Sequence, residues 1–317
     1  MISAIKIKNY RSFINAEAKL SPFTLVIGPN GAGKSNLLRC LRDVFWQNTP
    51  NRRGLWGKTP ILPLAKQRHL NLASTPCEVQ LYLASGTQVV IDENLRPPDG
   101  LINPNDLGWY SIDPRTVGLE EPIGPDAVVR TTGKGAVAVL DSLKTGDRED
   151  LFETIERHLR EYVPTIAKIS TRATSERGKI LQVREHHINA PFPVSELSEG
   201  TRLVLIILCI VFQENAPKVI LLEDIDRGLH PRLFQGVVEM LRTTTASTDS
   251  QIIATTHNPY MLDQFVDHED EVLIVEKEDG GSTITSLASR LDSTDSMEQA
   301  LGELWYGGFV GGVPKPR

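Results

Sequence analysis

The chain has 317 residues, of which 40% are hydrophobic, so it is long enough for one large domain or two small ones with a proper core. Its net charge of −6 is not that of a generally nucleic-acid-binding protein. The longest apolar run, residues 203 to 212, is too short to cross a bilayer, and the N-terminus has no apolar signal region. Three scattered cysteines lack metal-ligand spacing. These features predict a soluble cytoplasmic protein without a membrane partner.

The N-terminal part of the chain reads as strands followed by a helix. Residues 2 to 8 alternate like a half-buried strand, and residues 23 to 27 are apolar throughout, as in a fully buried strand. Helical periodicity runs from Ser35 to about Phe45. Beyond it Pro, Gly, Asn and Asp become frequent, and residues 77 to 91 predict two strands joined at Ser85-Gly86.

The C-terminal part alternates between helices and strands. A helix is expected from about 143 to 163, ended by Pro164. Beyond residue 195 the order is a helix, the strand KVILL, the helix PRLFQGVVEML, the strand QIIATT, and the strand-like stretches EVLIVEK and STITSL. Alternating strands and helices at both ends of one chain predict a mostly parallel sheet that is assembled from distant segments.

The stretch GPNGAGKS matches G-x-x-x-x-G-K-[ST] at Gly28, Gly33, Lys34 and Ser35, with a strand before it and a helix after it. The glycines allow backbone N–H groups to surround a phosphate at the positive end of the helix. Lys34 is expected to reach the β- and γ-phosphates and Ser35 to bind Mg²⁺. The alternative is a glycine-rich turn without a ligand. The residues predicted to contact the triphosphate are Asn30, Gly31, Ala32, Gly33, Lys34, Ser35 and Asn36.

Two later strands end in polar residues that suit the same chemistry. Val219 to Leu222 form an apolar run that ends in Glu223 and Asp224, where the first acid would hold the Mg²⁺ water shell and the second would polarise the attacking water. His257 follows the apolar strand QIIATT and is expected to touch the γ-phosphate. A surface acidic turn and a structural histidine are the alternatives.

The segment LSEGT precedes a strongly apolar helix, for which Ser198 is a good N-cap. A helix N-terminus that exposes a hydroxyl and the N–H of Gly200 can bind phosphate. Because one triphosphate is already enclosed by residues 28 to 35, this second phosphate-binding end predicts a site completed by another subunit. An ordinary capped core helix is the alternative.

The stretches GPNGAGKSN, LSEGT, LLEDIDRGLHP and TTHNP together resemble the ABC-type ATPases of the RecF/SMC/OLD class. NYRSF and LGELWYGGFVGG resemble a compact bacterial subgroup of AAA-family ATPases. The resemblance covers about 1 to 45 and 140 to 317 and implies two heads that close around two ATP–Mg²⁺. Ser198 and Gly200 of one copy would then face the γ-phosphate bound by Lys34 of the other, with Arg11 and Ser12 near the nucleotide.

The chain departs from the family pattern at several positions. Glu223-Asp224 replaces the usual Asp-Glu, which leaves Asp224 one methylene short as a base, and a misplacement of ~1 Å can cost about 100-fold in rate. An alternative register pairs Asp224 with Mg²⁺ and Asp226 with water, but the match of the following loop to the family argues against it. Ile225 replaces a common proline. The family's Mg²⁺-sensing glutamine has only two weak candidates, Gln67 and Gln80.

Between Arg39 and Arg68 lie seven basic residues, with Trp46 and Trp56 among them and Asp43 as the single acid. Cations with aromatic residues on a Pro/Gly-rich loop can contact nucleic acid, and a solvated loop or a patch for a partner protein are the alternatives. The candidate nucleic-acid contacts are Arg52, Arg53 and Lys58.

Three functions compete. The first is an ATPase, slow or stimulated by a partner, that dimerises or forms a higher oligomer through its ATP sites and acts in DNA metabolism or anti-phage defence. It would control an effector protein such as a nuclease, with DNA as a further partner. The second is a non-catalytic, ATP-gated scaffold. The third, the nucleotide-binding subunit of a transporter, is disfavoured by the long insertion and the RecF-like N-terminus.

The expected architecture is α/β. Residues 1–317 would form a single discontinuous ABC-type ATPase head, a P-loop NTPase with a mixed or parallel sheet, an antiparallel β-subdomain and a helical signature lobe. Its core would comprise residues 1–45 and 195–317. Residues 46–194 would be an insertion without a coiled coil.

Overall fold

The structure is a computed structural model that describes residues 1–46, 67–69, 72, 74–92, 103–122, 124, 127–175, 178–292 and 300–313. The chain forms two compact units. The first contains Met1–Trp109, Lys218–Asp226 and Val238–Arg317, and the second contains Tyr110–Pro217 and Arg227–Val237. Segments from both ends of the chain therefore build the first unit, as the alternating pattern predicted.

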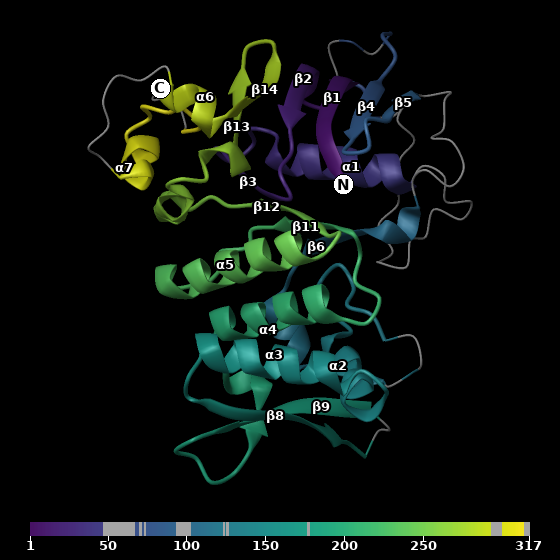
Figure 1. The fold of residues 1–317 in the computed structure, drawn as a ribbon, viewed down its shortest axis with the longest axis vertical. Coiled ribbons are helices and arrows are strands. Elements are labelled where there is room, and N and C mark those ends of the chain that lie inside the picture. The colour runs from purple at the N-terminus through teal and green to yellow at the C-terminus, as the bar shows by residue number, and fades with distance from the viewer. Residues whose placement is uncertain are drawn as a thin grey trace. The chain divides into compact units, whose positions relative to one another are not determined.

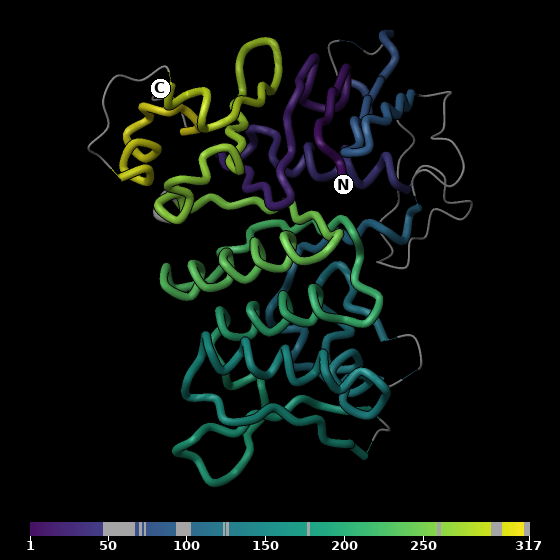
Figure 2. The backbone as a smooth tube through the Cα atoms, viewed as in Figure 1, coloured from purple at the N-terminus to yellow at the C-terminus, as the bar shows by residue number. Residues whose placement is uncertain are grey.

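A six-stranded sheet forms the centre of the first unit, in the order β14-β13-β3-β12-β11-β6. The strand β3 comes from the N-terminal part and lies between two C-terminal strands, with which it pairs in parallel (Figure 2). The edge strand β14 is antiparallel to β13. The strands are β3 (Phe23–Ile27), β6 (Leu107–Ser111), β11 (Val219–Glu223), β12 (Gln251–Thr255), β13 (Val272–Glu278) and β14 (Gly281–Ser286).

The parallel strands are apolar because both of their faces are covered. All five residues of β3 and of β12 are buried, and so are the first four of β11. The helix α1 (Lys34–Trp46) follows β3, and α5 (Pro231–Ser247) connects β11 with β12. The predicted mostly parallel sheet is confirmed, and its parallel strands end at one edge.

The first unit also contains a four-stranded antiparallel sheet, in the order β2-β1-β4-β5. Its strands are β1 (Ile2–Tyr10), β2 (Phe13–Lys19), β4 (Glu78–Leu83) and β5 (Gln88–Asp92). The hairpin predicted at Ser85-Gly86 is confirmed, and Gly86 has the φ of +84° that such a turn requires. The turn between β1 and β2 instead places Arg11 at φ +47°.

The C-terminal end of the first unit contains further short helices. They are 3₁₀ helices at Pro259–Phe265 and Glu269–Glu271, α6 (Leu287–Leu291) and α7 (Leu301–Tyr306). The backbone N–H of Gly302 donates to Asp263 Oδ1 at 2.8 Å, and Trp305 Nε1 donates to the Gly312 carbonyl at 2.9 Å. These bonds fix α7 against the rest of the C-terminal segment.

The second unit packs three helices on a small sheet. The helix α3 contacts α2, α4 and β8, and the sheet order is β10-β9-β7 with β8 paired to β9 (Figure 1). The elements are β7 (Glu121–Pro122), α2 (Ala136–Thr145), α3 (Glu149–Tyr162), β8 (Ile166–Ala173), β9 (Gly178–Glu185), β10 (Phe192–Pro193) and α4 (Glu199–Phe212).

The helix expected from about 143 to 163 is correct only from Glu149 to Tyr162. The preceding residues belong to α2, which ends at Thr145 with Gly146 as its C-cap. Gly146, Asp147 and Arg148 separate the two helices, a break that the prediction of one helix missed. The apolar run 203 to 212 is helical, and Ser198 caps it as predicted by accepting from the Thr201 N–H.

Candidate nucleotide-binding site

The loop after β3 has the backbone that phosphate binding requires. Gly28, Gly31 and Gly33 have φ values of +145°, +77° and +123°, a region that side chains rarely enter. A Cβ at Gly28 would lie 2.1 Å from the Val275 carbonyl oxygen, and one at Gly33 would lie 2.8 Å from Ser12 Oγ. Glycine is therefore required at both ends of the loop by space as well as by conformation.

Lys34 begins α1 and is buried, with 5% of its surface exposed. Its Nζ donates to the carbonyl oxygens of Gly28, at 2.7 Å, and Pro29, at 3.1 Å. Nζ also lies 3.1 Å from Nδ1 of His257. Burial lowers the pKa of Lys34 to about 8, and the charges of Asp224 and Asp226 oppose this shift. The ammonium group is thus fixed inside the glycine loop.

Asp224 follows β11 at the same edge of the sheet, because β11, β12 and β3 are parallel. Its φ is +51°, and its N–H donates to Thr255 Oγ1 at 3.0 Å. Its Oδ1 lies 3.4 Å from Nε2 of His257. The sequence places Lys34, His257 and Asp224 in three separate motifs. In the structure they form one continuous chain of polar contacts.

The charge state of His257 follows from these neighbours. Partial burial lowers the pKa of His257, and the positive charge of Lys34 lowers it further. A neutral ring whose Nδ1 accepts from the Lys34 ammonium carries its proton on Nε2, which then faces the Asp224 carboxylate. In this arrangement the ring links a cation to an anion at the edge where a γ-phosphate would lie.

The acids beyond β11 occupy different surroundings. Glu223 is the last residue of β11 and is half-buried, whereas the side chain of Asp224 is 55% exposed. Burial raises the pKa of Asp226, and a hydrogen bond from Thr256 opposes this. The two acids that act on the charge of Lys34 are Asp224 and Asp226. These charges fit both assignments of the acids. In the family register Glu223 holds Mg²⁺ and Asp224 acts on water, and in the alternative register Asp224 holds Mg²⁺ and Asp226 acts on water.

Ile225 stands where the family commonly has proline. Its N–H donates to the Thr255 carbonyl oxygen at 3.1 Å, which extends the contact between β11 and β12. A proline could not make this bond. The substitution therefore has a structural reason at this position.

The turn between β1 and β2 supports the glycine loop. Asn36 Nδ2 donates to Ser12 Oγ at 2.9 Å, which brings the predicted residues Ser12 and Asn36 together. Ser282, at the start of β14, donates from its N–H to the Ser12 carbonyl at 2.6 Å and from its hydroxyl to the Ala32 carbonyl at 2.5 Å. Sequence reasoning missed Ser282, because a serine within an edge strand carries no signal of its own.

Arg11 lies beside this loop but has other neighbours. Its guanidinium carbon is 5.8 Å from the centre of the Tyr10 ring, and burial raises the pKa of Asp43, a shift that the Arg11 charge partly opposes. Its N–H donates to the Gln67 carbonyl at 2.6 Å. Gln80, on β4, bonds instead to Glu78 and Tyr82. Of the two glutamine candidates, Gln67 is the one adjacent to a residue expected near the nucleotide.

The LSEGT segment belongs to the second unit. Ser198 and Glu199 are exposed, and Arg227 Nε lies 3.0 Å from Glu199 Oε1. Gly200 is buried, and a Cβ there would lie 2.5 Å from the Gly228 carbonyl oxygen. The helix N-terminus thus has an exposed serine beside a glycine that close packing requires.

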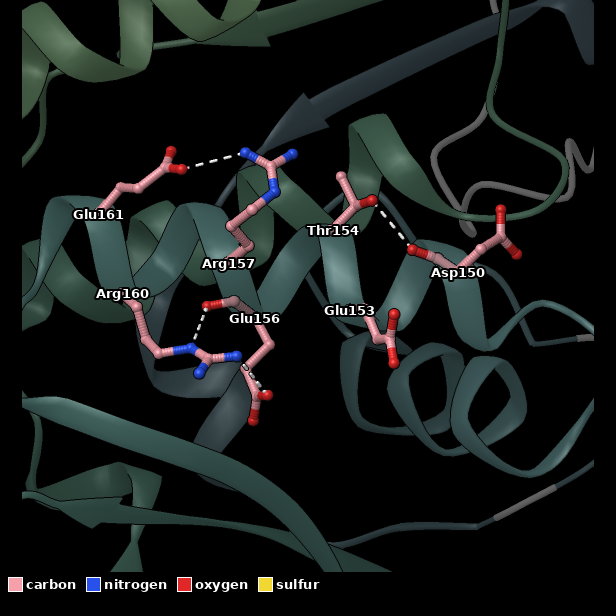
Figure 3. Close-up of a pocket in the computed structure, with 7 residues that line it drawn as sticks. All are labelled: Asp150, Glu153, Thr154, Glu156, Arg157, Arg160 and Glu161. Atoms are coloured by element: carbon pink, nitrogen blue, oxygen red, sulfur yellow. Dashed lines mark hydrogen bonds and ion pairs between the residues drawn. The ribbon is translucent and has the colours of Figure 1, made fainter.

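Two further features do not join this site. The candidate nucleic-acid contacts Arg52, Arg53 and Lys58 lie outside the described residues. A cavity of ≈ 710 Å³ in the second unit is lined by four acids, two arginines and a threonine of α3, and both arginines pair with acids of this set (Figure 3). It contains none of the predicted site residues.

The fold and the arrangement of this site resemble those of P-loop ATPases of the RecF/SMC/OLD-like class, which the sequence motifs also resemble. Residues 1–102 match the family described as "AAA ATPase domain". Residues 126–263 match the family described as "AAA domain, putative AbiEii toxin, Type IV TA system". The first match contains the glycine loop, and the second contains the segment from Glu223 to His257.

Among curated proteins, the chain is similar to the Septu protein PtuA of Bacillus mycoides (strain KBAB4), with 25% identity over 305 residues. This match covers 87% of the chain and 41% of PtuA, so the chain spans less than half of that relative. A shorter match, 36% identical over 53 residues, links it to the OLD nuclease of Thermus scotoductus (strain ATCC 700910 / SA-01). It covers 17% of the chain and 10% of the OLD nuclease.

Among solved structures, the chain resembles an Smc head bound to the C-winged helix domain of ScpA, with a TM-score of 0.59. The identity is 15%, and the match covers 92% of this chain and 99% of that one. The predicted α/β head fold with mixed parallel and antiparallel sheets is therefore confirmed. Within the described residues, the helices are too short or too polar to cross a membrane.

Proposed function

We propose that the chain binds ATP–Mg²⁺ in the glycine loop, hydrolyses it slowly or under the control of a partner, and dimerises around it. In this proposal it acts in DNA metabolism or anti-phage defence and controls an effector protein such as a nuclease. The observation that carries the proposal is the contact chain from Lys34 through His257 to Asp224. It brings a phosphate-binding cation and a candidate base to one sheet edge.

The residues present fit an ATP–Mg²⁺ ligand. Lys34 is already directed toward backbone carbonyl groups inside the glycine loop, so it can exchange these acceptors for phosphate oxygens without leaving its position. Ser35 and Glu223 would hold Mg²⁺, which would neutralise phosphate charge when bound. Mg²⁺ usually takes only one or two protein ligands beside phosphates and waters. In line with this, the described residues form no cluster of three or more His, Cys, Asp or Glu that could hold a metal.

The protein groups would then have separate roles in hydrolysis. Lys34 would bind the β- and γ-phosphates, and Asp224 would accept a proton from the attacking water. His257 would orient that water or the γ-phosphate and hold Asp224 in place through Nε2. The roles of Glu223 and Asp226 depend on the register, which we propose to be the family one.

Dimerisation is supported by the exposure of the LSEGT turn. Ser198 and Glu199 are accessible, so a second copy could reach them. The N-terminus of the 14-residue helix α4 carries positive partial charge and suits a γ-phosphate. Residues of one copy would thereby complete the triphosphate site of the other.

The effector and the biological process are supported by the comparisons. The likeness to Septu protein PtuA and to an OLD nuclease agrees with anti-phage defence and with a nuclease as the effector. The Smc head with the similar fold is bound to a domain of another protein, ScpA. A partner protein is therefore part of the proposal.

An ATP-gated scaffold with little turnover is the second candidate. It is favoured by the short side chain of Asp224 and by its exposure, because both leave a carboxylate loosely positioned as a base. In this case ATP binding alone would be the signal.

Binding, turnover and association test the proposal separately. Wild type should bind ATP–Mg²⁺ in calorimetry, Lys34→Ala should not, and an absence of binding in the wild type would overturn the proposal. Steady-state hydrolysis, with and without DNA, separates the ATPase from the scaffold. Ser198→Arg should keep ATP binding but prevent association at saturating ATP in sedimentation experiments. Full association of that variant would contradict the two-copy site.

A further inference from the structure

The outer face of the β8–β9 hairpin in the second unit has a distinct charge. Alternate residues of the two strands point inward, where Thr171 Oγ1 donates to Asp141 Oδ1 of α2 at 2.6 Å. The buried inward residues are Ile166, Ile169, Leu181 and Val183. Because neighbouring residues of a strand point to opposite faces, the other set points outward. Its charged members are Lys168, Arg172 and Arg184, and all three are exposed.

The strand register brings two of these cations together. Lys168 and Arg184 are direct cross-strand partners, so their side chains share one face at the closest spacing in the sheet. Like charges at such positions repel each other and destabilise the pair. Over the described part of the chain, no carboxylate lies within 4.0 Å of Lys168, Arg172 or Arg184. Within the described residues, no carboxylate therefore offsets this repulsion.

Several other cations of the same unit are paired with carboxylates. Lys179, on β9 but pointing inward, lies 2.5 Å from Asp141 Oδ1. Along α3, Arg157 pairs with Glu161 at 3.0 Å and Arg160 with Glu156 at 2.7 Å (Figure 3). The outer face of β8–β9 thus contrasts with α3, where Arg157 and Arg160 are each paired with an acid of the same helix. In a chain of net charge −6, such a local cationic patch would attract an external anion.

We propose that the outer face of β8–β9 binds the phosphate backbone of double-stranded DNA. Along β8, Lys168 and Arg172 are four residues apart, which at about 3.3 Å per residue separates them by roughly 13 Å. This distance spans several phosphates of one strand, whose charges repeat about every 3.4 Å along the helix axis. Neither strand contains an aromatic residue, so the face lacks the stacking groups typical of single-strand binding.

The contact would be independent of sequence, because backbone phosphates carry no base information. We choose DNA as the source of these phosphate groups because the inference rests on the proposed function in DNA metabolism or anti-phage defence. The inference also moves the DNA contact from the loop of Arg52, Arg53 and Lys58 to a surface that the strand register defines. Binding of DNA to this face requires neither ATP binding nor ATP hydrolysis.

The test is fluorescence anisotropy with the full chain and a labelled 30-bp DNA duplex, between about 50 and 200 mM salt, without nucleotide. The test variant is Lys168→Gln/Arg172→Gln/Arg184→Gln. Losing three phosphate contacts should lower the slope of log affinity against log salt by about 2.7, at about 0.9 per contact. The affinity at the lowest salt should fall by at least about tenfold. The melting temperature of the variant should be no lower than that of the wild type, because the substitutions remove the repulsion between Lys168 and Arg184.

The matched control is Arg148→Gln/Arg157→Gln/Arg160→Gln, which removes three cations of the same unit that are paired with Asp150, Glu161 and Glu156. Its slope should equal that of the wild type. The inference is overturned by an unchanged slope in the test variant, by an equal loss in the control, or by no binding of the wild type at 50 mM salt. Tighter binding of an equally long RNA duplex would overturn the choice of DNA.

ATP hydrolysis without DNA is measured on the same variants and should be unaffected, because none of these residues belongs to the nucleotide site. If hydrolysis is absent in all of them while the slope changes as expected, the inference stands and the proposed ATPase fails. If hydrolysis is present and the slope does not change, the ATPase stands and the inference fails.

Discussion

His257 lies between Lys34 and Asp224, with Nδ1 at 3.1 Å from the Lys34 ammonium and Nε2 at 3.4 Å from the Asp224 carboxylate. Each residue comes from a different loop, and each loop follows a different parallel strand. The ring therefore contacts both ends of the proposed site. Its position makes it a sensitive place to test the proposed chemistry.

Replacing His257 by Ala should slow ATP turnover by about 10²–10⁴-fold, the usual range for a group that positions or transfers a proton. ATP binding should remain, because Lys34 keeps its two carbonyl acceptors. Single-turnover hydrolysis at saturating ATP is the measurement. The control is His268→Ala, which removes an exposed histidine of the same unit. Equal rates for the two variants would show that His257 has no part in turnover.

Restoring the missing methylene should speed the reaction if Asp224 is the base. Asp224→Glu is expected to raise the rate constant by up to about 100-fold, because about 1 Å of misplacement costs that much. Asp224→Asn should lose turnover. Rapid-quench hydrolysis measures both. If the Glu variant is as slow as the Asn variant while Asp226→Asn abolishes turnover, the alternative register is correct.

ATP affinity should decrease as the pH rises above about 8. Burial lowers the pKa of Lys34 to about 8, so the ligand-free protein loses this proton at a pH where a phosphate-bound lysine would keep it. Binding must then take up a proton, and the affinity falls by up to about tenfold per pH unit above the lowered pKa. Calorimetry between pH 7 and 9.5 at saturating Mg²⁺ measures this. Lys34→Arg, which stays charged, should show no such decrease.

Gly28→Ala should destabilise the first unit strongly. The new Cβ would meet the Val275 carbonyl oxygen at 2.1 Å and would force a side chain into φ +145°. Strain and overpacking of about 1–3 kcal/mol each give a loss of roughly 2–6 kcal/mol in the free energy of unfolding. Gly31→Ala is the control, because its φ is +77° with no atom within 4 Å, and it should cost about 1–2 kcal/mol. Urea denaturation compares them, and equal losses would contradict the packing argument.

The buried ion pair within α1, Arg42 and Asp43, should contribute strongly to stability. Arg42 Nη2 lies 2.6 Å from Asp43 Oδ1, and Tyr10 donates to Asp43 Oδ2 at 2.8 Å, with all three residues buried. Asp43→Ala leaves the Arg42 charge buried without its partner, which should cost about 3–5 kcal/mol. Tyr10→Phe removes one bond to a charged group and should cost about 1.5–3 kcal/mol. Chemical denaturation measures both, and a loss for Asp43→Ala below that for Tyr10→Phe would contradict this ranking.

Local patterns predicted the elements that carry the nucleotide site. The glycine spacing, the strand before it and the helix after it were readable because each depends on a few adjacent residues. The cap at Ser198 was equally local. The same local reading failed between α2 and α3, where the prediction of one helix missed the break at Gly146, Asp147 and Arg148.

The residues that support the site could not be predicted from local sequence patterns. Ser282 donates to Ala32, 250 residues earlier, and Thr255 accepts from the N–H of Asp224, 31 residues earlier. Neither residue type is diagnostic by itself. The reason that Ile225 replaces proline also appears only in the bond from its N–H to β12.

The sequence by itself determined that the chain carries a glycine-rich loop between a strand and a helix, a capped LSEGT helix, and acids and a histidine after apolar strands. These features depend on backbone conformations that nearby side chains select. Only the tertiary structure decided that Lys34, His257 and Asp224 are in contact and that Lys168 lies opposite Arg184. Such neighbours are set by strand order and register, which arise from burying apolar surface among segments far apart in the chain.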